Sequence, residues 1–477
     1  MPTDGRSHGA PGAGAAGQGP GVAQPIGPGG DSGGFGTGGR SRLGLWSGVG
    51  LVVANTVGVG VLTNTGYMAG RLGAREILLA WLVGGVMAMS GAICYAAIAE
   101  EIPRSGGEYR YLSELLHPFL GTLAGWTSLL VGFSAPVALA ASTAGPFFVT
   151  LFPGVSAGSV GVALILIAAA TQAFHLGFSK RTQDALALVK ILLLAGFVVV
   201  GFTLGSHAIP AWPALHATGA FPLRAFAVSL VYVTFAFSGW NTAIYAAEEF
   251  QDPRRTVPRA MLLGTAIVTV VYLLVNWIFV ANLSSDRLGV WLQGDTARIT
   301  LAHLLMDQLA GQTAARLTSL FVVLSLTSSV ISMTLVGPRV SAAMADAGFL
   351  PRALGTREGR PPLRSVFLQC GVALGLLATH SFEELLRSVG AILTVTSGLT
   401  VSALVRLRWG KRARRVRPSS LVMICALVYV AGSVWILWFT LTEAPRTLLW
   451  LAIVTVMAAL GYAFTARTRA ASRDKPR

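Results

Sequence analysis

The chain has 477 residues, of which 53% are hydrophobic and only 12% are charged, and its mean hydropathy is +0.65. Soluble domains usually carry about 25% charged residues, so this composition excludes an ordinary soluble protein and indicates a chain that lies mostly in lipid. The net charge of +16 does not indicate nucleic-acid binding, because the Lys and Arg residues lie in short connectors between apolar segments.

Residues 1–42 form a segment rich in Gly, Ala and Pro with almost no large apolar side chains. Such a segment cannot bury enough surface to fold, so we expect a disordered tail. It does not read as a signal peptide, because no apolar core follows a basic start and no cleavage site is evident.

About twelve apolar runs follow the tail, long enough to span ~30 Å of hydrocarbon, the ninth being the shortest. They predict an all-α integral membrane protein, with helices one to ten in residues 43–410, helices eleven and twelve in 411–466, and a basic tail in 467–477. The runs lie near Gly44–Met68, Glu76–Ala99, Leu120–Phe148, Ser159–Leu176, Asp184–Leu204, Arg224–Ala247, Val257–Leu283, Arg316–Gly337, Ser365–Thr379, Leu385–Leu407, Ser419–Leu441 and Thr447–Ala466.

The basic residues indicate how these runs are oriented. If the tail is cytoplasmic, 27 of the 36 Lys and Arg residues fall in inside segments, 8 fall in outside loops, and the remaining one is Lys190. Positive charge concentrates on the cytoplasmic side, so we expect both termini inside. The basic segment Arg406–Arg417 could in addition bind anionic lipid head groups.

The first run is interrupted at its centre by Ala54-Asn-Thr-Val-Gly-Val-Gly-Val61. An unwound segment at bilayer depth leaves backbone N–H and C=O groups that lipid cannot satisfy, so they must line a cavity and bind something. The half that restarts near Val61 offers amides suited to a carboxylate, and the half that ends near Asn55 offers carbonyls suited to an ammonium. A close helix-packing site at Gly58 and Gly60 is the alternative.

The sixth run is interrupted in the corresponding place by Phe235-Ala-Phe-Ser-Gly-Trp-Asn241. Freed carbonyls here could meet the same ammonium while Phe235 or Trp240 closes over the solute. An aromatic core stripe is the alternative. Helices one and six each open a set of five, and matching breaks in two sets predict an inverted repeat with a substrate site at its interface.

Lys190 lies in the middle of the fifth run. A charge at bilayer depth costs several kcal/mol unless it faces protein or water, so this lysine is a functional candidate. Burial disfavours the charged form, and a lysine that releases its proton could couple proton movement to transport. Alternatively it snorkels to the surface, because it lies only about ten ångströms of helix beyond Gln183, at ~1.5 Å per residue.

Two connectors on the expected inside carry dense charge, Glu100–Tyr109 and Glu248–Arg259. They could form ion pairs that make and break as an inner gate moves, or they could be solvated loops. The glutamates have no nucleophile or metal cluster nearby, His175 and His303 have no partner at metal-ligand spacing, and no Walker-type loop occurs. We therefore expect no enzyme, no metal, no cofactor and no ATP-driven step.

Four motifs run in order from helix one to the segment after helix eight. They are Gly58-Val-Gly-Val61, Pro103-Arg-Ser-Gly-Gly-Glu-Tyr109, Phe235–Asn241 followed by Glu248-Glu249 and Asp252-Pro253, and Arg339–Pro351. Together they resemble the amino acid–polyamine–organocation (APC) superfamily of permeases. Within it, the chain is most similar to the L-type (light-chain) amino acid transporters and the bacterial cationic amino acid transporters.

The resemblance implies a LeuT-like five-plus-five inverted repeat with discontinuous helices one and six, two further helices, and alternating access by rocking of one bundle. By position, amides around Gly58, Val59 and Gly60 would take the substrate's α-carboxylate. Phe235 matches a gating aromatic, and Lys190 matches a helix-five lysine that fills the place of a sodium ion in sodium-coupled relatives. Carbonyls for the α-ammonium would come from near Thr56, Val57, Phe235, Ala236 and Ser238. The whole substrate-binding set is Thr56, Val57, Gly58, Val59, Gly60, Val61, Phe235, Ala236, Phe237, Ser238, Gly239 and Trp240.

Three departures from the family pattern bear on substrate and partners. Val59 replaces the usual Ser or Ala, and Ser238 stands where light-chain relatives usually have glycine, so side-chain preference stays open. The segment Val149–Gly158 lacks the cysteine by which light chains bond a glycoprotein heavy chain, so we expect no such partner. The cysteines of this chain lie in apolar runs and are expected to be buried packing residues: Cys94, Cys370 and Cys425.

The resemblance thus implies a secondary amino acid transporter, proton-linked or exchanging, in the cell membrane, most simply a bacterial cytoplasmic membrane. Its partners would be an amino acid and membrane lipid, and a homodimer stays open. The alternatives are a polyamine or other amine carrier, and an amino acid sensor that keeps the fold without transporting.

Overall fold

The computed structural model describes residues 43–58, 60–173, 180–209, 221–283, 295–346, 348–355, 362–410 and 417–473. The expected tail over residues 1–42, the candidate residue Val59 and the predicted lone His175 lie outside the described residues. So do the last four residues of the predicted basic tail, 474–477, whereas the helix before them continues to Arg473.

Every described element is helical apart from one isolated parallel bridge, in which Leu43 N–H donates to the Glu249 carbonyl (2.9 Å) and Gln251 N–H donates to the Leu43 carbonyl (3.2 Å). The first half of the chain contains α1 (Leu45–Thr56), α2 (Gly60–Ala69), α3 (Ala74–Glu101), α4 (Glu108–Leu115), α5 (Pro118–Thr127), the π-helix η1 (Ser128–Ser134), α6 (Ala135–Leu151), α7 (Ala157–Ala173), α8 (Lys180–Leu204) and α9 (Leu223–Ala236). The second half contains the 3₁₀-helix η2 (Thr242–Glu249), α10 (Pro253–Asn282), α12 (Asp295–Ile299), α13 (Leu301–Asp346), the 3₁₀-turn η3 (Arg352–Leu354), α14 (Leu363–Thr379), α15 (Phe382–Ser402), α16 (Leu404–Trp409), α17 (Ser420–Glu443) and α18 (Arg446–Arg473).

Within the described residues, the predicted apolar runs coincide with helices or with consecutive helical segments. Eight helical stretches are long and apolar enough to cross a membrane, and four shorter apolar helices accompany them among the described residues. The chain is therefore an all-α, multi-pass membrane protein. The eighth run, predicted from Arg316, lies in the second part of α13, which follows a kink at Gly311 (φ 81°); the residues from Leu301 to that kink form a separate helical segment.

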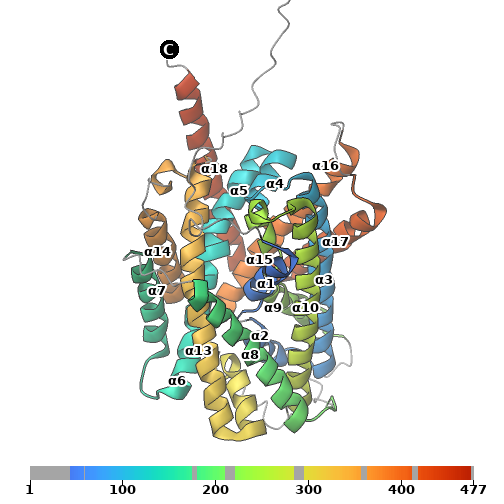
Figure 1. Ribbon diagram of the computed structural model, residues 1–477, viewed down its shortest axis with the longest axis vertical. Helices are drawn as coiled ribbons and strands as arrows, with labels where there is room; N and C mark the ends of the chain where they lie inside the picture. Colours follow the sequence, from blue (N-terminus) through green and yellow to red (C-terminus); the bar gives the residue numbers. More distant parts are fainter. Residues whose placement is uncertain are drawn as a thin grey trace, which may run out of the picture. The chain divides into compact units, whose positions relative to one another are not determined.

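The helices pack in two groups that are distant in sequence. On one side, α3 lies against α10, α9 and α17, and α10 also contacts α1; on the other, α7 contacts α6 and α14 (Figure 1). The long helix α13 passes between them and contacts α6 and α8. Large apolar side chains of the outer helices are exposed, such as Leu427 of α17 and Leu449 of α18, as expected of surfaces that face lipid.

Candidate functional site

The first interruption lies where the sequence predicts it. Helix α1 ends at Thr56, Val57 is extended (φ −69°, ψ 103°), and α2 begins at Gly60. Gly60 is fully enclosed, and a β-carbon there would lie 2.7 Å from the Ala236 Cβ at the end of α9. The glycine is thus required by the close approach of α2 to α9, and it leaves the first amides of α2 next to the end of α9.

The second interruption follows Ala236, the last residue of α9. Gly239 has φ +109°, and a β-carbon on it would lie 2.7 Å from the Asn55 carbonyl oxygen. Only glycine combines this left-handed backbone with so close an approach. The chain then resumes as η2 at Thr242. The two breaks therefore touch each other, and each break uses a glycine at the point of contact.

Tyr272 of α10 holds the two breaks together. Its hydroxyl lies 2.8 Å from the Thr56 carbonyl oxygen and 2.9 Å from the Ala236 carbonyl oxygen, the last residues of α1 and α9. Asn64 of α2 adds a second link by donating to the Tyr232 carbonyl at 2.6 Å. Sequence reasoning missed both residues. A polar ring or amide within an apolar helix was the available signal, but it does not say which carbonyl is the partner.

The predicted site residues occupy different surroundings. Phe235 and Trp240 are almost buried, and Trp240 packs edge-on against Tyr95 of α3 with ring centroids 4.8 Å apart. Phe237 is fully buried and packs on Tyr272 (5.0 Å) and on Trp81. The second break thus turns one aromatic ring toward α3 and another toward α10. Thr56, Val57 and Gly58, with Val61 and Gly60, form the facing side. Ala236, Ser238 and Gly239 complete the second break, and the position of Val59 is not described.

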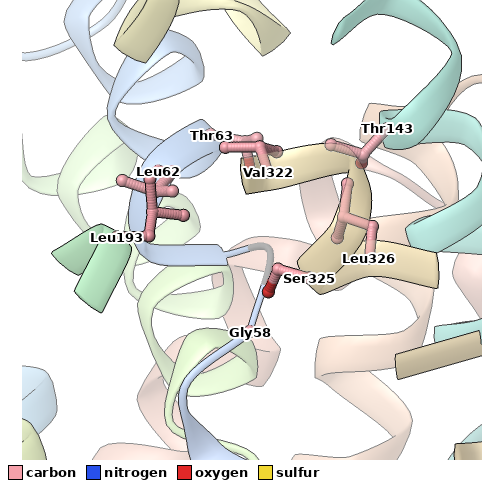
Figure 2. Close-up of a pocket in the computed structure, with 8 residues that line it drawn as sticks. All are labelled: Gly58, Leu62, Thr63, Thr143, Leu193, Val322, Ser325 and Leu326. Atoms are coloured by element: carbon pink, nitrogen blue, oxygen red, sulfur yellow. The ribbon is translucent and has the colours of Figure 1, made fainter. Parts of the chain in front are cut away.

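A small cavity lies beside the first break (Figure 2). It is bounded by α2, α6, α8 and α13 through Gly58, Leu62, Thr63, Thr143, Leu193, Val322, Ser325 and Leu326. Its volume is about 10 Å³, and a cavity needs ~10–15 Å³ to hold one water molecule. The cavity is therefore too small to hold an amino acid.

Lys190 of α8 points to the same region. Its ammonium donates to the Ser329 hydroxyl of α13 at 2.8 Å, and that hydroxyl donates to the Ser325 carbonyl at 3.1 Å. Ser325 lines the cavity, one helical turn from Ser329. The lysine therefore bonds across to a neighbouring helix rather than reaching the surface, and a chain of two hydrogen bonds connects it to the edge of the cavity.

A cluster of ion pairs lies just after α2, at the end of the first broken helix that is farthest along the chain from the start of α1. Arg71, just after α2, pairs with Glu383 (3.0 Å) and Glu443 (2.5 Å), and Glu383 also pairs with Arg387. The Tyr232 hydroxyl of α9 donates to Glu383 at 2.7 Å. The cluster joins α2, α9, α15 and α17, and sequence reasoning did not identify it. Tyr67, one turn before it, stacks on Phe382 with ring centroids 5.4 Å apart.

The two charged connectors, Glu100–Tyr109 and Glu248–Arg259, are linked by a hydrogen bond of 3.0 Å from the Glu248 amide to the Ser105 hydroxyl. Two ion pairs that involve them, Arg104–Glu114 and Arg255–Asp252, are both 3.8 Å long and solvent-exposed. Whether the connectors form gate ion pairs or are solvated loops stays a prediction.

The comparisons with known proteins agree with this architecture. The model of the family "Amino acid permease" matches residues 43–466. The chain belongs to this amino acid permease family. It is 28% identical over 429 residues to the large neutral amino acids transporter small subunit 2 of Rattus norvegicus, which covers 87% of this chain and 78% of the relative.

Two further relatives extend the comparison. The Asc-type amino acid transporter 1 of Mus musculus is 26% identical over 423 residues, covering 85% of this chain and 77% of the relative. The serine/threonine exchanger SteT of Bacillus subtilis (strain 168) is 26% identical over 412 residues, covering 84% and 91%.

The expected resemblance to APC-superfamily permeases and to the L-type transporters is thereby confirmed. The permease is a secondary amino acid transporter and a multi-pass membrane protein. Because the family and its relatives are transporters, the expectation that the chain is not an enzyme is also confirmed.

Proposed function

We propose that this permease moves neutral amino acids by alternating access, as an exchanger or with a proton, and binds the zwitterion at the two breaks. The observation that carries the proposal is the direct contact of the breaks, at Gly60 with Ala236 and at Gly239 with Asn55. Amides at the start of α2 suit the carboxylate, and carbonyls at the ends of α1 and α9 suit the ammonium.

The Tyr272 hydroxyl would compete with the substrate ammonium for the same backbone carbonyls. The Thr56 and Ala236 carbonyls that would receive the ammonium are held by the Tyr272 hydroxyl when the breaks are closed together. A substrate ammonium replaces or shares these hydrogen bonds. Because a hydroxyl group carries one proton, Tyr272 bonds either carbonyl or shares its proton between them after the substrate departs, which lowers the cost of cycling between the empty and loaded states.

The contacts between helices support an inverted repeat of two five-helix sets. Counting α1–α2 as helix one and α9–η2 as helix six, helix one contacts helix seven (α10) and helix six contacts helix two (α3). Likewise α7 lies on α6 as α14 lies on α13, and α8 lies on α13 as α15 lies on α6. In each of these pairs, replacing each helix by the one five places earlier or later in the chain turns the first contact into the second, as two related halves require. The proposed core is residues 43–410, with two more helices in 411–466 and twelve spans in all.

The cavity walls support a substrate class. The described side chains that line it are aliphatic or hydroxylic, with Leu193, Val322 and Leu326 on the apolar part. They include no charged group to pair with a cationic or anionic side chain, so neutral amino acids are favoured. The names of the relatives, which refer to neutral amino acids and to serine and threonine, support the same class.

Lys190 is the proposed coupling residue. Lys190 bonds the Ser329 hydroxyl, and among the described residues it forms no ion pair with a carboxylate that would keep it charged. Loss of its proton would loosen α8 from α13 beside the cavity. The position occupied by sodium in sodium-coupled relatives would thus be filled by a group that exchanges protons.

Orientation, location and partners are part of the proposal. The bias of basic residues supports cytoplasmic termini, which places α4 and η2 inside and the Arg71–Glu383 cluster outside, in the cell membrane of a bacterium. The proposal includes no disulfide-linked heavy chain, and it includes contact with membrane lipid. A homodimer is compatible with it, and it needs no metal or cofactor.

The decisive experiment is counterflow in proteoliposomes. Vesicles loaded with unlabelled serine or leucine should take up the same labelled amino acid much faster than empty vesicles, and arginine should not replace them. Binding without flux would contradict transport and leave an amino acid sensor. Strong competition by a serine methyl ester would contradict carboxylate recognition and favour an amine carrier.

A further inference from the structure

Glu108 is a buried acid outside the proposed substrate site. It is the first residue of α4, only 8% exposed, at the end of the bundle where α1 begins. The Tyr95 hydroxyl of α3 donates to its carboxyl group, and the Asn241 amide donates to the same oxygen at 3.3 Å. Among the described residues Glu108 belongs to no ion pair, and Arg104, four residues earlier, pairs with Glu114 instead.

The surroundings of Glu108 are aromatic and uncharged. Tyr95 of α3, Tyr245 of η2 and Tyr429 of α17 are the titratable groups whose electrostatics couple to it. Of the helices packed on α4, α5 has no charged side chain, and α15 with its extension α16 supplies Arg406, which binds the Leu115 and Leu116 carbonyls at the other end of α4.

The other charged groups on α4 itself are Arg110 and Glu114. Arg110 influences the neighbouring Tyr111, not Glu108. Burial raises the pKa of Glu108 to about 7, and the hydrogen bond from Tyr95 lowers it in part. The carboxyl group is thus placed to change its charge near neutral pH without a cation beside it.

Glu108 is joined to the second break by direct contacts. Asn241, its amide donor, comes immediately before η2, and Trp240, one residue earlier, packs on the same Tyr95 ring. The turn before α4 fits closely as well, because a β-carbon on Gly107 (φ +63°) would overlap the Tyr245 ring of η2. Glu108 therefore lies at the junction of α3, α4 and the half of the broken helix that follows the second break.

We propose that Glu108 is a positioning residue of the transport cycle, which in its neutral form holds η2 against α3 and keeps this end of the permease closed, and which releases η2 when it ionises. This inference rests on the proposed function, because it assigns a gate to the same second break. The proton leaves to, and returns from, water on the side of the membrane where α4 lies. It is not carried across, which separates this role from that of Lys190.

The direction of the pH effect follows from the environment. In the closed form burial favours the neutral carboxyl group, and in the open form water and the N-terminal end of α4 favour the carboxylate. A group with a raised pKa contributes stability that is complete below its ordinary pKa and is lost as the pH rises through its raised pKa. With values of 4.5 and about 7, closing is favoured about tenfold more at pH 6 than at pH 8.

The test compares Glu108→Gln with the wild type and with Glu114→Gln, a control on the same short helix. Thermal unfolding in detergent and counterflow with equal pH on both sides are each measured from pH 5.5 to 8.5. The wild type and Glu114→Gln should be more heat-stable at pH 6 than at pH 8 and should exchange several-fold faster at pH 8. Glu108→Gln, which is permanently neutral, should lose most of both dependences.

Two outcomes would overturn the proposal. One is a Glu108→Gln permease whose pH profiles match the wild type in both measurements. The other applies if that variant does not fold: Tyr95→Phe, which removes a donor to the carboxylate, should move the midpoints to higher pH, and unmoved midpoints count against the proposal. If the wild type shows no counterflow at all, the proposed function fails, and the unfolding profile alone decides the role of Glu108.

Discussion

Gly60 and Ala236 lie in direct contact, with the position of a β-carbon on Gly60 only 2.7 Å from the Ala236 Cβ. This contact brings the start of α2 to the end of α9 and so places the amides of one break opposite the carbonyls of the other.

We expect Gly60→Leu to abolish amino acid binding. A side chain here forces α2 away from α9, at a cost of about 1–3 kcal/mol or more for overpacking, and each 1.4 kcal/mol taken from binding is about tenfold in affinity. Binding is measured by the thermal shift on adding amino acid. Gly50→Leu is the matched control, because nothing lies within 4 Å of a β-carbon at Gly50. Retained affinity in Gly60→Leu would move the site elsewhere.

Removal of the Tyr272 hydroxyl should loosen both breaks. Tyr272→Phe leaves two buried carbonyls without this donor, and we expect a loss of about 1–3 kcal/mol of stability together with an exchange rate reduced several-fold. Tyr111→Phe serves as the control, because the Tyr111 hydroxyl is buried without a hydrogen-bond partner among the described residues. Equal behaviour of the two variants would show that Tyr272 only fills space.

Lys190→Ala should remove concentrative uptake driven by a pH gradient while leaving counterflow at equal pH largely intact. Ser329→Ala should weaken the same uptake, because the ammonium loses its hydrogen-bond acceptor. Thr203→Val on the exposed side of α8 is the control, since among the described residues its hydroxyl bonds to carbonyls of its own helix. If Lys190→Ala has the rate and the pH dependence of the wild type, the lysine does not couple protons to transport.

Glu383→Ala should destabilise the permease by disrupting the ion-pair cluster of Arg71, Glu383, Arg387 and Glu443. Arg387 is only 13% exposed and would lose its nearest carboxylate, and Arg71 would lose one of two. Removing one partner of a fully buried pair costs about 3–5 kcal/mol, and partial exposure reduces our expectation to about 1–2 kcal/mol. Arg446→Gln breaks an exposed pair and should have no measurable effect. Thermal unfolding of both variants checks this, and a wild-type profile for Glu383→Ala would contradict it.

Much of the architecture was predictable because a membrane restricts the choices. Long apolar runs had to be helices, and glycines in the middle of such helices had to mark breaks or close contacts. Both alternatives for Gly60 hold together in the structure, since the residue stands at a break and also packs against Ala236. The binding roles given to the two breaks stay predictions.

The parts that escaped prediction are long-range pairings of side chains. Arg71 and Glu443 are 372 residues apart in the sequence, and neither has a local pattern that names the other. Tyr272 was missed for the same reason, and Glu108 was singled out only as part of a charged connector, because the burial and the partners of both appear only when separate helices come together. The role suggested for Val59, in setting which side chain is accepted, lies outside the described residues and stays a prediction.

The bridge between Leu43 and Phe250 has a mechanical consequence. Two backbone hydrogen bonds tie Leu43, two residues before α1, to Glu249 at the end of η2 and to Gln251 just after it, so α1 and η2 are joined there as well as at Gly239. Because α1 and η2 are joined at both ends, we expect them to move as one rigid unit. A motion that displaces α1 therefore also displaces η2. Moving only one of the two segments would require the contacts at the bridge or at Gly239 to break.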